Sequence, residues 1–255
     1  MTLVATARFF CCAYLFTQVV TTTHAQELRF QSSARQTALI ELYTSEGCSS
    51  CPLAEAWLSQ LRADPGLWMS FVPIAFHVDY WDKLGWRDRF AAAKFTARQR
   101  AYAVEWGGDS LYTPAFAVNG REWRGWSGER RFSTANKENV GVLTAETRDA
   151  HRFTITFEPE GKSGSQWQVH LALLGGEISS KIGAGENSGR NLRHDFVVLE
   201  ERSAPMKSKE KVATAEIVLE SATPADVPQK AIAIWVARPD QLVPVQAIGG
   251  WLFKK

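Results

Sequence analysis

The chain has 255 residues, of which 45% are hydrophobic and 22% are charged. These proportions are ordinary for a folded protein and exclude general disorder, and the length suffices for one large domain or two small ones. The formal net charge of +2 produces no strong electrostatic field, and lysine and arginine are not concentrated in a basic stripe. We therefore expect no nucleic acid partner.

The first 25 residues have the pattern of a secretory signal peptide. Arg8 is followed by the apolar run FFCCAYLF, the segment turns polar at residues 21–23, and the triplet Thr23-His24-Ala25 predicts cleavage after Ala25. A membrane anchor is the alternative, but the apolar run is shorter than the roughly 20 residues that a spanning helix needs. We expect a secreted or periplasmic protein with no stable membrane insertion after cleavage.

Cleavage would remove two of the four cysteines, Cys11 and Cys12. A lipoprotein modified at one of them is a weaker alternative, because neither follows a complete apolar stretch with small residues before it. The mature chain would keep only Cys48 and Cys51, three positions apart, in a compartment where disulfides form.

The two remaining cysteines lie between a predicted strand and a predicted helix. Residues Ala38–Tyr43 (ALIELY) form a short apolar run with β-formers, which predicts a buried strand. After Cys51, apolar residues recur at helical spacing until Asp64-Pro65-Gly66 ends the pattern: Leu53, Trp57, Leu58 and Leu61. The cysteines therefore occupy the turn and the first helical turn.

Further elements continue a β-α-β-α order. Phe71–Val78 predicts a second buried strand, and Arg89–Glu105 a helix that Trp106-Gly107-Gly108 ends. Ala115–Val118 and the residues after the turn pair Asn119-Gly120 predict a hairpin. A last helix is expected over Ser127–Leu143.

From about Arg152 the pattern changes to short strands separated by glycine and serine. Most of these segments alternate apolar and polar residues, as half-buried antiparallel strands do: Phe153–Phe157, Trp167–Leu171, Phe196–Leu199, Ala215–Leu219 and Ala231–Val236. We expect a sandwich-like all-β domain over residues 149–255, after a first domain over residues 26–148.

The spacing of Cys48 and Cys51 at a helix start indicates thiol chemistry. Free N–H groups and the positive end of the helix dipole stabilise a Cys48 thiolate, which makes Cys48 the predicted nucleophile. Cys51, one turn further in and less exposed, is then the resolving thiol that attacks a mixed disulfide at Cys48. A structural disulfide that only fixes a turn is the alternative.

Several motifs resemble known families. The order strand, CSSCP, helix, strand, helix, then Thr113-Pro114 before a strand resembles the thioredoxin-like superfamily. More narrowly, ELYTSEGCSSCP at Glu41–Pro52, FHVDYWD at Phe76–Asp82, and GENSGR at residues 185–190 followed by His194-Asp195 resemble the secreted family known as domain of unknown function 1223. The resemblance covers nearly the whole mature chain.

The resemblance implies a fold class and a binding role. It implies an α/β thioredoxin-like domain followed by a smaller all-β, sandwich-like domain. It also implies a cis bond before Pro114, with Pro114 beside the disulfide, and an extended peptide substrate bound along the backbone of Thr113.

Two further groups of residues are possible auxiliaries of the site. His77 and Asp79 alternate on a predicted strand, where they serve either as hydrogen-bonded structural residues or in the chemistry, His77 then acting as a proton relay to Cys51 or as a third metal ligand. Glu186, Asn187 and Arg190 either reach toward the first domain or make a tight connection between strands, and the loop composition favours the connection.

The sequence as a whole predicts an exported thiol–disulfide oxidoreductase. Cys48 and Cys51 would exchange disulfides with a protein partner, with no organic cofactor and no metal. Two alternatives stay open: a copper- or zinc-binding carrier with Cys48, Cys51 and His77 as ligands, and a non-catalytic interaction module with a structural disulfide.

Overall fold

The computed structural model is dominated by β-strands, which account for 46% of it, against 15% for helix. The α-helices of the described residues are α1 (Cys51–Gln60) and α2 (Ala93–Glu105). The described residues are 27–128, 132, 138–161, 166–220 and 227–252.

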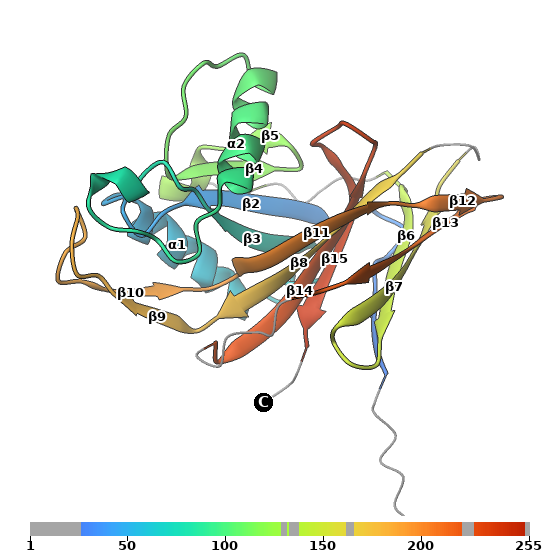
Figure 1. Cartoon of the computed structure of the whole chain (residues 1–255). Helices are drawn as coiled ribbons and strands as arrows, with labels where there is room; N and C mark the ends of the chain where they lie inside the picture. Colours follow the sequence, from blue (N-terminus) through green and yellow to red (C-terminus); the bar gives the residue numbers. More distant parts are fainter. Residues whose placement is uncertain (1–26, 129–131, 133–137, 162–165, 221–226, 253–255) are drawn as a thin grey trace, which may run out of the picture.

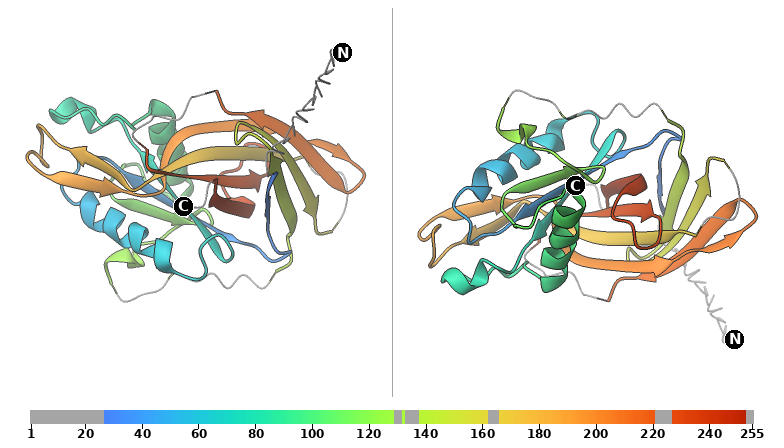
Figure 2. Two further views of the ribbon diagram at one scale, coloured as in Figure 1. Left: turned by 90° about the horizontal axis from the view of Figure 1, so that it is seen from below. Right: turned by 90° about the horizontal axis from the view of Figure 1, so that it is seen from above.

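An eight-stranded sheet forms the centre of the molecule, with strand order β15-β14-β8-β11-β3-β2-β4-β5. Strands β2 and β3 are parallel, β11 joins the free edge of β3 in parallel through the pair Val197 and Ala75, and the other neighbours are antiparallel. Helices α1 and α2 lie on opposite faces of the sheet (Figures 1 and 2). The strand bounds are β2 Ala38–Thr44, β3 Phe71–His77, β4 Ala115–Val118, β5 Arg121–Glu122, β8 Gln168–Gly176, β11 Val197–Pro205, β14 Gln229–Ala237 and β15 Pro244–Trp251.

A five-stranded sheet packs against one half of the large sheet, at the right of Figure 1. Its order is β1-β6-β7-β13-β12, with bounds β1 Leu28–Gln31, β6 Gly141–Thr147, β7 Arg152–Pro159, β12 Lys207–Lys209 and β13 Val212–Val218. A separate hairpin, β9 (Ile178–Lys181) and β10 (Asn191–His194), extends toward α1. Short 3₁₀ helices complete the described elements: η1 Leu61–Ala63, η2 Asp82–Leu84 and η3 Gly125–Ser127.

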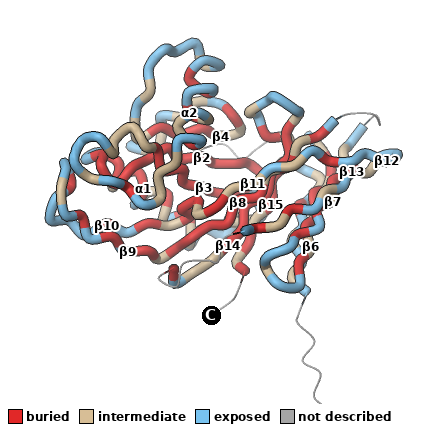
Figure 3. The backbone as a smooth tube through the Cα atoms, viewed as in Figure 1, coloured by how far each residue is buried: buried red, intermediate tan, exposed pale blue. Residues whose placement is uncertain are grey.

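Both faces of the β2 and β3 half of the large sheet belong to one core, whereas in the half that packs against the five-stranded sheet the two faces belong to two different cores, as strand β14 shows. Because side chains alternate along a strand, Ala231, Ala233 and Trp235 enter the core that packs α1 and α2, whereas Ile232, Ile234 and Val236 enter the core shared with the five-stranded sheet. All residues of β2 and β3 are buried, as expected of central strands covered on both faces (Figure 3).

The predicted fold class was wrong. An α/β thioredoxin-like domain followed by a smaller all-β domain does not describe a chain with 46% strand, 15% helix and large multi-stranded sheets. The sequence pattern predicted which segments form buried strands, but it did not indicate which strands pair with each other. Strands from the second half of the sequence continue the sheet that β2 and β3 begin. The predicted boundary near residue 148 stays a prediction.

The local predictions mostly match the structure. The strands expected at Ala38–Tyr43, Phe71–Val78 and Ala115–Val118 and the helix after Cys51 are present within one or two residues, and α2 begins at Ala93 rather than Arg89. Of the helix expected over Ser127–Leu143, residues 129–131 and 133–137 lie outside the described residues, and its described C-terminal end is wrong: residues 138–140 are not helical and Gly141–Leu143 begin strand β6.

The predicted signal peptide, residues 1–25, also lies outside the described residues. Among the residues that the structure describes, no helix is long and apolar enough to cross a membrane.

A buried ion pair ties α2 to the central strand β2. Arg98 donates to both carboxylate oxygens of Glu41, with distances of 2.7 Å and 3.0 Å, and the hydroxyls of Tyr43 and Tyr102 donate to the same carboxylate. The side chain of Glu41 is fully buried. This network fixes the position of α2 against the middle of β2.

Replacing Glu41 by Gln should destabilise the protein by about 3 kcal/mol, because Arg98 is left as an uncompensated buried charge. Urea unfolding measures the free energy of unfolding. Glu105→Gln, on the exposed end of the same helix, is the matched control and should change it by less than about 0.5 kcal/mol. Equal effects of the two changes would contradict the structural role of the ion pair.

Candidate functional site

Cys48 and Cys51 form a disulfide at the start of α1. Cys51 is the first residue of the helix and Pro52 the second, as predicted, and the Cys51 amide donates to the Cys48 carbonyl. Both cysteines are buried, with 1% and 0% of their surface exposed, whereas Ser49 and Ser50 between them are exposed. The expected difference in exposure between nucleophile and resolving thiol is therefore absent in the disulfide state.

The loop between β9 and β10 contacts the cysteine turn. The side-chain amide of Asn187 donates to the carbonyls of Glu46 and Cys48, at 2.8 Å and 2.9 Å, and the Ser49 amide donates to a carboxylate oxygen of Glu186 at 3.1 Å. Arg190 donates to the Asn187 side-chain oxygen and so orients the amide. The favoured interpretation of these residues as only a connection between strands was wrong: they hold the turn that carries the disulfide.

The Thr113–Pro114 peptide bond is cis, as the resemblance implied. The Trp81 indole N–H donates to the Thr113 hydroxyl at 2.8 Å, and Trp81 also packs against Gly47, the residue before Cys48. Trp81 thus links the segment of Thr113 and Pro114 to the cysteine turn. Peptide binding along Thr113 stays a prediction.

His77 and Asp79 have separate environments. The Thr96 hydroxyl donates to Asp79 at 2.6 Å and accepts from the Asp79 amide, which attaches Asp79 to α2. His77 is fully buried beside Asp88, with 2.6 Å between its Nδ1 and the carboxylate. Of the two predicted auxiliaries, only His77 enters the buried charge cluster described next.

Five ionisable side chains from five segments form a buried cluster adjacent to the cysteine turn. Glu46 comes from that turn, Glu55 from α1, His77 from the end of β3, Asp88 from the segment before α2 and His194 from the end of β10. None exposes more than 5% of its surface. Buried charges persist only when they are paired, so the five side chains depend on one another.

Within this cluster, each histidine contacts carboxylates, and the two histidine rings contact each other. His194 Nδ1 is hydrogen-bonded to Glu55, and its Nε2 lies 3.3 Å from a carboxylate oxygen of Glu46. Asp88 accepts from the Glu46 amide in addition to its bond with His77. The two imidazole rings meet edge to face with centroids 5.4 Å apart.

Burial and pairing shift the pKa values of the cluster in opposite directions. Burial by itself lowers the pKa of His194, but the charge and hydrogen bond of Glu55, together with the nearby Glu46 carboxylate, outweigh it and raise the pKa to about 10. The pKa of His77 is raised because Asp88 outweighs burial in the same way. Burial raises the pKa of Glu46, Glu55 and Asp88, but the neighbouring histidines together with further hydrogen-bond donors more than offset it, and the net shift is downward.

Most residues of this cluster were not predicted from the sequence, although one signal was present. Glu55 lies four residues after Cys51 and three before Leu58, on the apolar face of the predicted helix, and a carboxylate on such a face needs a buried partner. His194 and Glu46 belong to the motifs that carry the family resemblance, but neither was predicted to be a site residue. Asp88 gave no signal, because its burial follows from the path of an irregular segment.

Among the described residues, one group of His, Cys, Asp and Glu brings three donor atoms within 4.8 Å of one another, and it consists of Glu55, His77 and His194. Neither cysteine belongs to it. The predicted carrier site of Cys48, Cys51 and His77 is not assembled while the two sulfurs are bonded to each other.

The model of the family described as "Protein of unknown function (DUF1223)" matches residues 39–237, which include the cysteine turn and the whole cluster. The chain belongs to this family. A search of the curated proteins gives no significant match.

Two solved structures share the fold of this DUF1223 protein. A crystal structure of an Agrobacterium tumefaciens protein has 20% identity and a TM-score of 0.61, covering 87% of this chain and 96% of its own. HBP35 of Porphyromonas gingivalis has 13% identity and a TM-score of 0.55, covering 86% of this chain and 76% of its own. At these identities the likeness concerns the fold alone.

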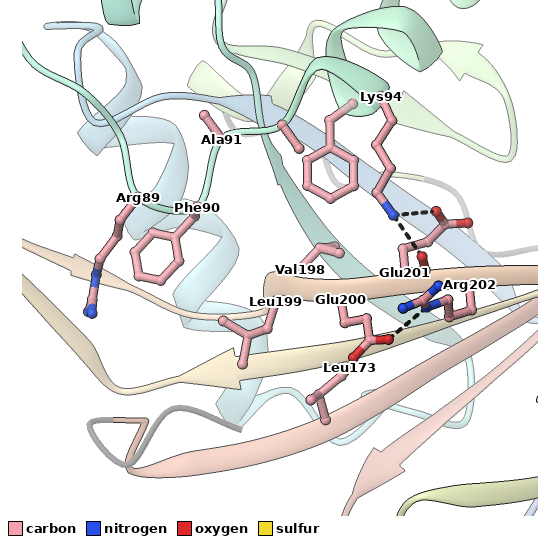
Figure 4. Close-up of a pocket in the computed structure, with 12 residues that line it drawn as sticks. Arg89, Phe90, Ala91, Lys94, Leu173, Val198, Leu199, Glu200, Glu201 and Arg202 are labelled. Atoms are coloured by element: carbon pink, nitrogen blue, oxygen red, sulfur yellow. Dashed lines mark hydrogen bonds and ion pairs between the residues drawn. The ribbon is translucent and has the colours of Figure 1, made fainter. Parts of the chain in front are cut away.

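A pocket of about 620 Å³ lies between the segment before α2 and strand β11 (Figure 4). No cysteine lines it, and the Phe90 ring lies between the pocket and both cluster histidines, with ring centroids 5.4 Å from His77 and 6.0 Å from His194. Its Lys94 and Glu201 are paired with each other at 3.0 Å. The pocket is therefore separate from the disulfide. The charges of Lys94 and Glu201 in its lining neutralise each other.

Glu201 should make the stability of the protein depend on acid pH. Burial alone would raise the pKa of Glu201, but His170 and Lys94 have the larger, opposite effect and lower the pKa to about 2. A depressed pKa means that the stabilisation is present above the ordinary value of 4.5 and is lost as the pH falls toward 2. Glu201→Gln should cost about 1–3 kcal/mol above pH 4.5, and its difference from wild type should shrink on acidification.

Thermal unfolding of both proteins over this pH range measures the effect. Glu216→Gln, which removes a looser ion pair with Arg152 (3.7 Å) on the surface, is the control and should show no such convergence. A constant difference between wild type and Glu201→Gln at all pH values would contradict the assignment.

Proposed function

We propose that this DUF1223 protein is an exported thiol–disulfide oxidoreductase that exchanges the Cys48–Cys51 disulfide with a protein partner. The observation that carries the proposal is the position of the pair: the second sulfur belongs to the first residue of a ten-residue helix. A disulfide in this position has a stabilised leaving thiolate, which makes it reducible.

The surroundings of the cysteines support a stabilised thiolate. No acidic residue lies in the first turn of α1, so the helix dipole there is not offset from within the helix. The Ser50 hydroxyl lies 3.4 Å from the Cys48 sulfur, where it can donate to a thiolate. Both features favour release of Cys48 or Cys51 as an anion.

The proposed exchange balances in atoms and electrons. In the reduced protein the Cys48 thiolate attacks one sulfur of a partner disulfide, a bond forms to Cys48, and the other partner sulfur leaves as a thiolate. The Cys51 thiolate then attacks Cys48, the Cys48–Cys51 bond forms, and the second partner thiolate leaves. The partner gains two electrons and the cysteine pair loses two, and oxidation of a partner dithiol is the reverse.

Export and peptide binding belong to the same proposal. The N-terminal pattern that ends at Ala25 supports export, and an oxidising compartment maintains the disulfide. The backbone of Thr113, linked to the cysteine turn through Trp81, is the proposed binding segment for the partner's extended peptide.

The reduction potential of the pair tests this proposal. Mature protein equilibrated in glutathione buffers, alkylated and analysed by mass, should give a potential between about −270 and −120 mV. A pair that stays oxidised below about −300 mV would contradict exchange and indicate a structural disulfide.

Two single-cysteine variants provide the matched comparison. Cys51→Ser keeps the proposed nucleophile without its resolving thiol, so it should accumulate a mixed disulfide with a small-molecule disulfide such as oxidised glutathione. Cys48→Ser should accumulate much less. Equal trapping by both variants would contradict the assigned roles.

The contacts of Asn187 should control how fast the disulfide reacts. Asn187→Ala removes two hydrogen bonds to the cysteine turn, each worth about 1 kcal/mol, so the loop should open more often and reduction by dithiothreitol should accelerate about tenfold or more. Ser188→Ala, in the same loop but exposed, is the control. An unchanged reduction rate in Asn187→Ala would show that this loop does not limit access.

A further inference from the structure

We propose that Glu55, His77 and His194 form a binding site for a divalent transition-metal ion, with Zn²⁺ the ion that the donor set fits best. The site is independent of the proposed disulfide exchange and uses neither sulfur. It draws one ligand each from α1, β3 and β10.

The donor atoms of the three side chains lie close together. One nitrogen or oxygen from each of the three side chains lies within 4.8 Å of the other two, and all three residues are buried. Two imidazoles and one carboxylate are a recurring ligand set for zinc, with the fourth position open. A bound ion would take the place of the proton between His194 Nδ1 and Glu55, and the three donor atoms would adjust to the distances of about 2.0–2.2 Å at which such ligands bind Zn²⁺.

His77 has one ring nitrogen without a hydrogen-bond partner. Its Nδ1 is bonded to Asp88 at 2.6 Å, whereas its Nε2 is buried without a hydrogen-bond partner. A buried polar atom without a partner costs about 1–3 kcal/mol, so such atoms call for an explanation. A histidine that donates one ring N–H to a carboxylate and presents the other nitrogen is the usual form of a metal ligand.

His194 and Glu55 also have neighbouring residues that orient them. Glu46 lies behind His194, 3.3 Å from Nε2, which leaves Nδ1 directed at Glu55. The second oxygen of Glu55 accepts from the Thr44 hydroxyl at 2.6 Å. Each proposed ligand is thus oriented by a further residue, as second-shell partners orient ligands in metal sites.

The charges of the cluster also fit a dication. Glu46, Glu55 and Asp88 supply three negative charges. The ion pairs of these three carboxylates are with His77 and His194. Two imidazolium ions compensate two of the three charges, and a divalent ion bound to neutral imidazoles compensates the same number. Metal binding therefore leaves the net charge of the buried cluster unchanged.

Metal titration of the wild-type protein tests the site. The protein is treated with chelator, its intact disulfide is verified by mass so that no thiol can bind metal, and Zn²⁺ or Co²⁺ is added. We expect one ion per chain, a Zn²⁺-dependent rise in the melting temperature, and Co²⁺ absorption of a nitrogen and oxygen site without sulfur-to-cobalt charge transfer. An oxidised wild-type protein that binds neither ion stoichiometrically would overturn the proposal and identify the cluster as an ion-pair network alone.

Variants assign the ligands. His77→Gln and His194→Gln should lose stoichiometric binding, whereas Asp88→Asn should weaken it by about 10–100-fold because it removes only the orienting partner. His151→Gln, an exposed histidine outside the cluster, is the matched control and should bind as the wild type does. Wild-type affinity in a folded His77→Gln protein would also overturn the site. If that variant does not fold, the Co²⁺ spectrum of the wild type still shows whether nitrogen and oxygen ligands bind the ion.

Discussion

The structure depends on one constraint: five ionisable side chains are buried together next to the cysteine turn, away from bulk solvent. Each removes part of the desolvation cost of another, so all five segments that carry them must arrive at the same place. The turn after β2, helix α1, the end of β3, the segment before α2 and the end of β10 are held in register by this requirement. The conformation of the cysteine turn follows from it.

The β9–β10 hairpin is where the two halves of the sequence meet at the site. It contributes His194 to the cluster and Asn187 to the backbone of the cysteine turn. Its position is set by β11, which follows it directly and pairs with β3 through Val197 and Ala75. The geometry around the disulfide therefore depends on strand pairing between segments more than a hundred residues apart.

The sequence predicted what is local and missed what is long-range. Periodicity located β2, β3 and α1, and the spacing of Cys48 and Cys51 before Pro52 located the helix start, because these features are encoded by neighbouring residues. The pairing of β11 with β3 has no such local signature, so the fold class was wrong. The same limit applies to the site: the position of Glu55 on an apolar helix face was a local signal that went unused, and that its partner is His194 depends on the tertiary fold.

The junction between β11 and β3 has a consequence for how the chain can be handled. In the intact protein the backbone groups along this border of β3 are partnered by β11 at Val197 and by the Ala75 amide's bond to Phe196. A shortened polypeptide that ends before β11 would present this apolar strand border to solvent, and such borders recruit other chains. Self-association of truncated forms would then reflect a missing neighbour rather than a defect in α1 or the cysteine turn.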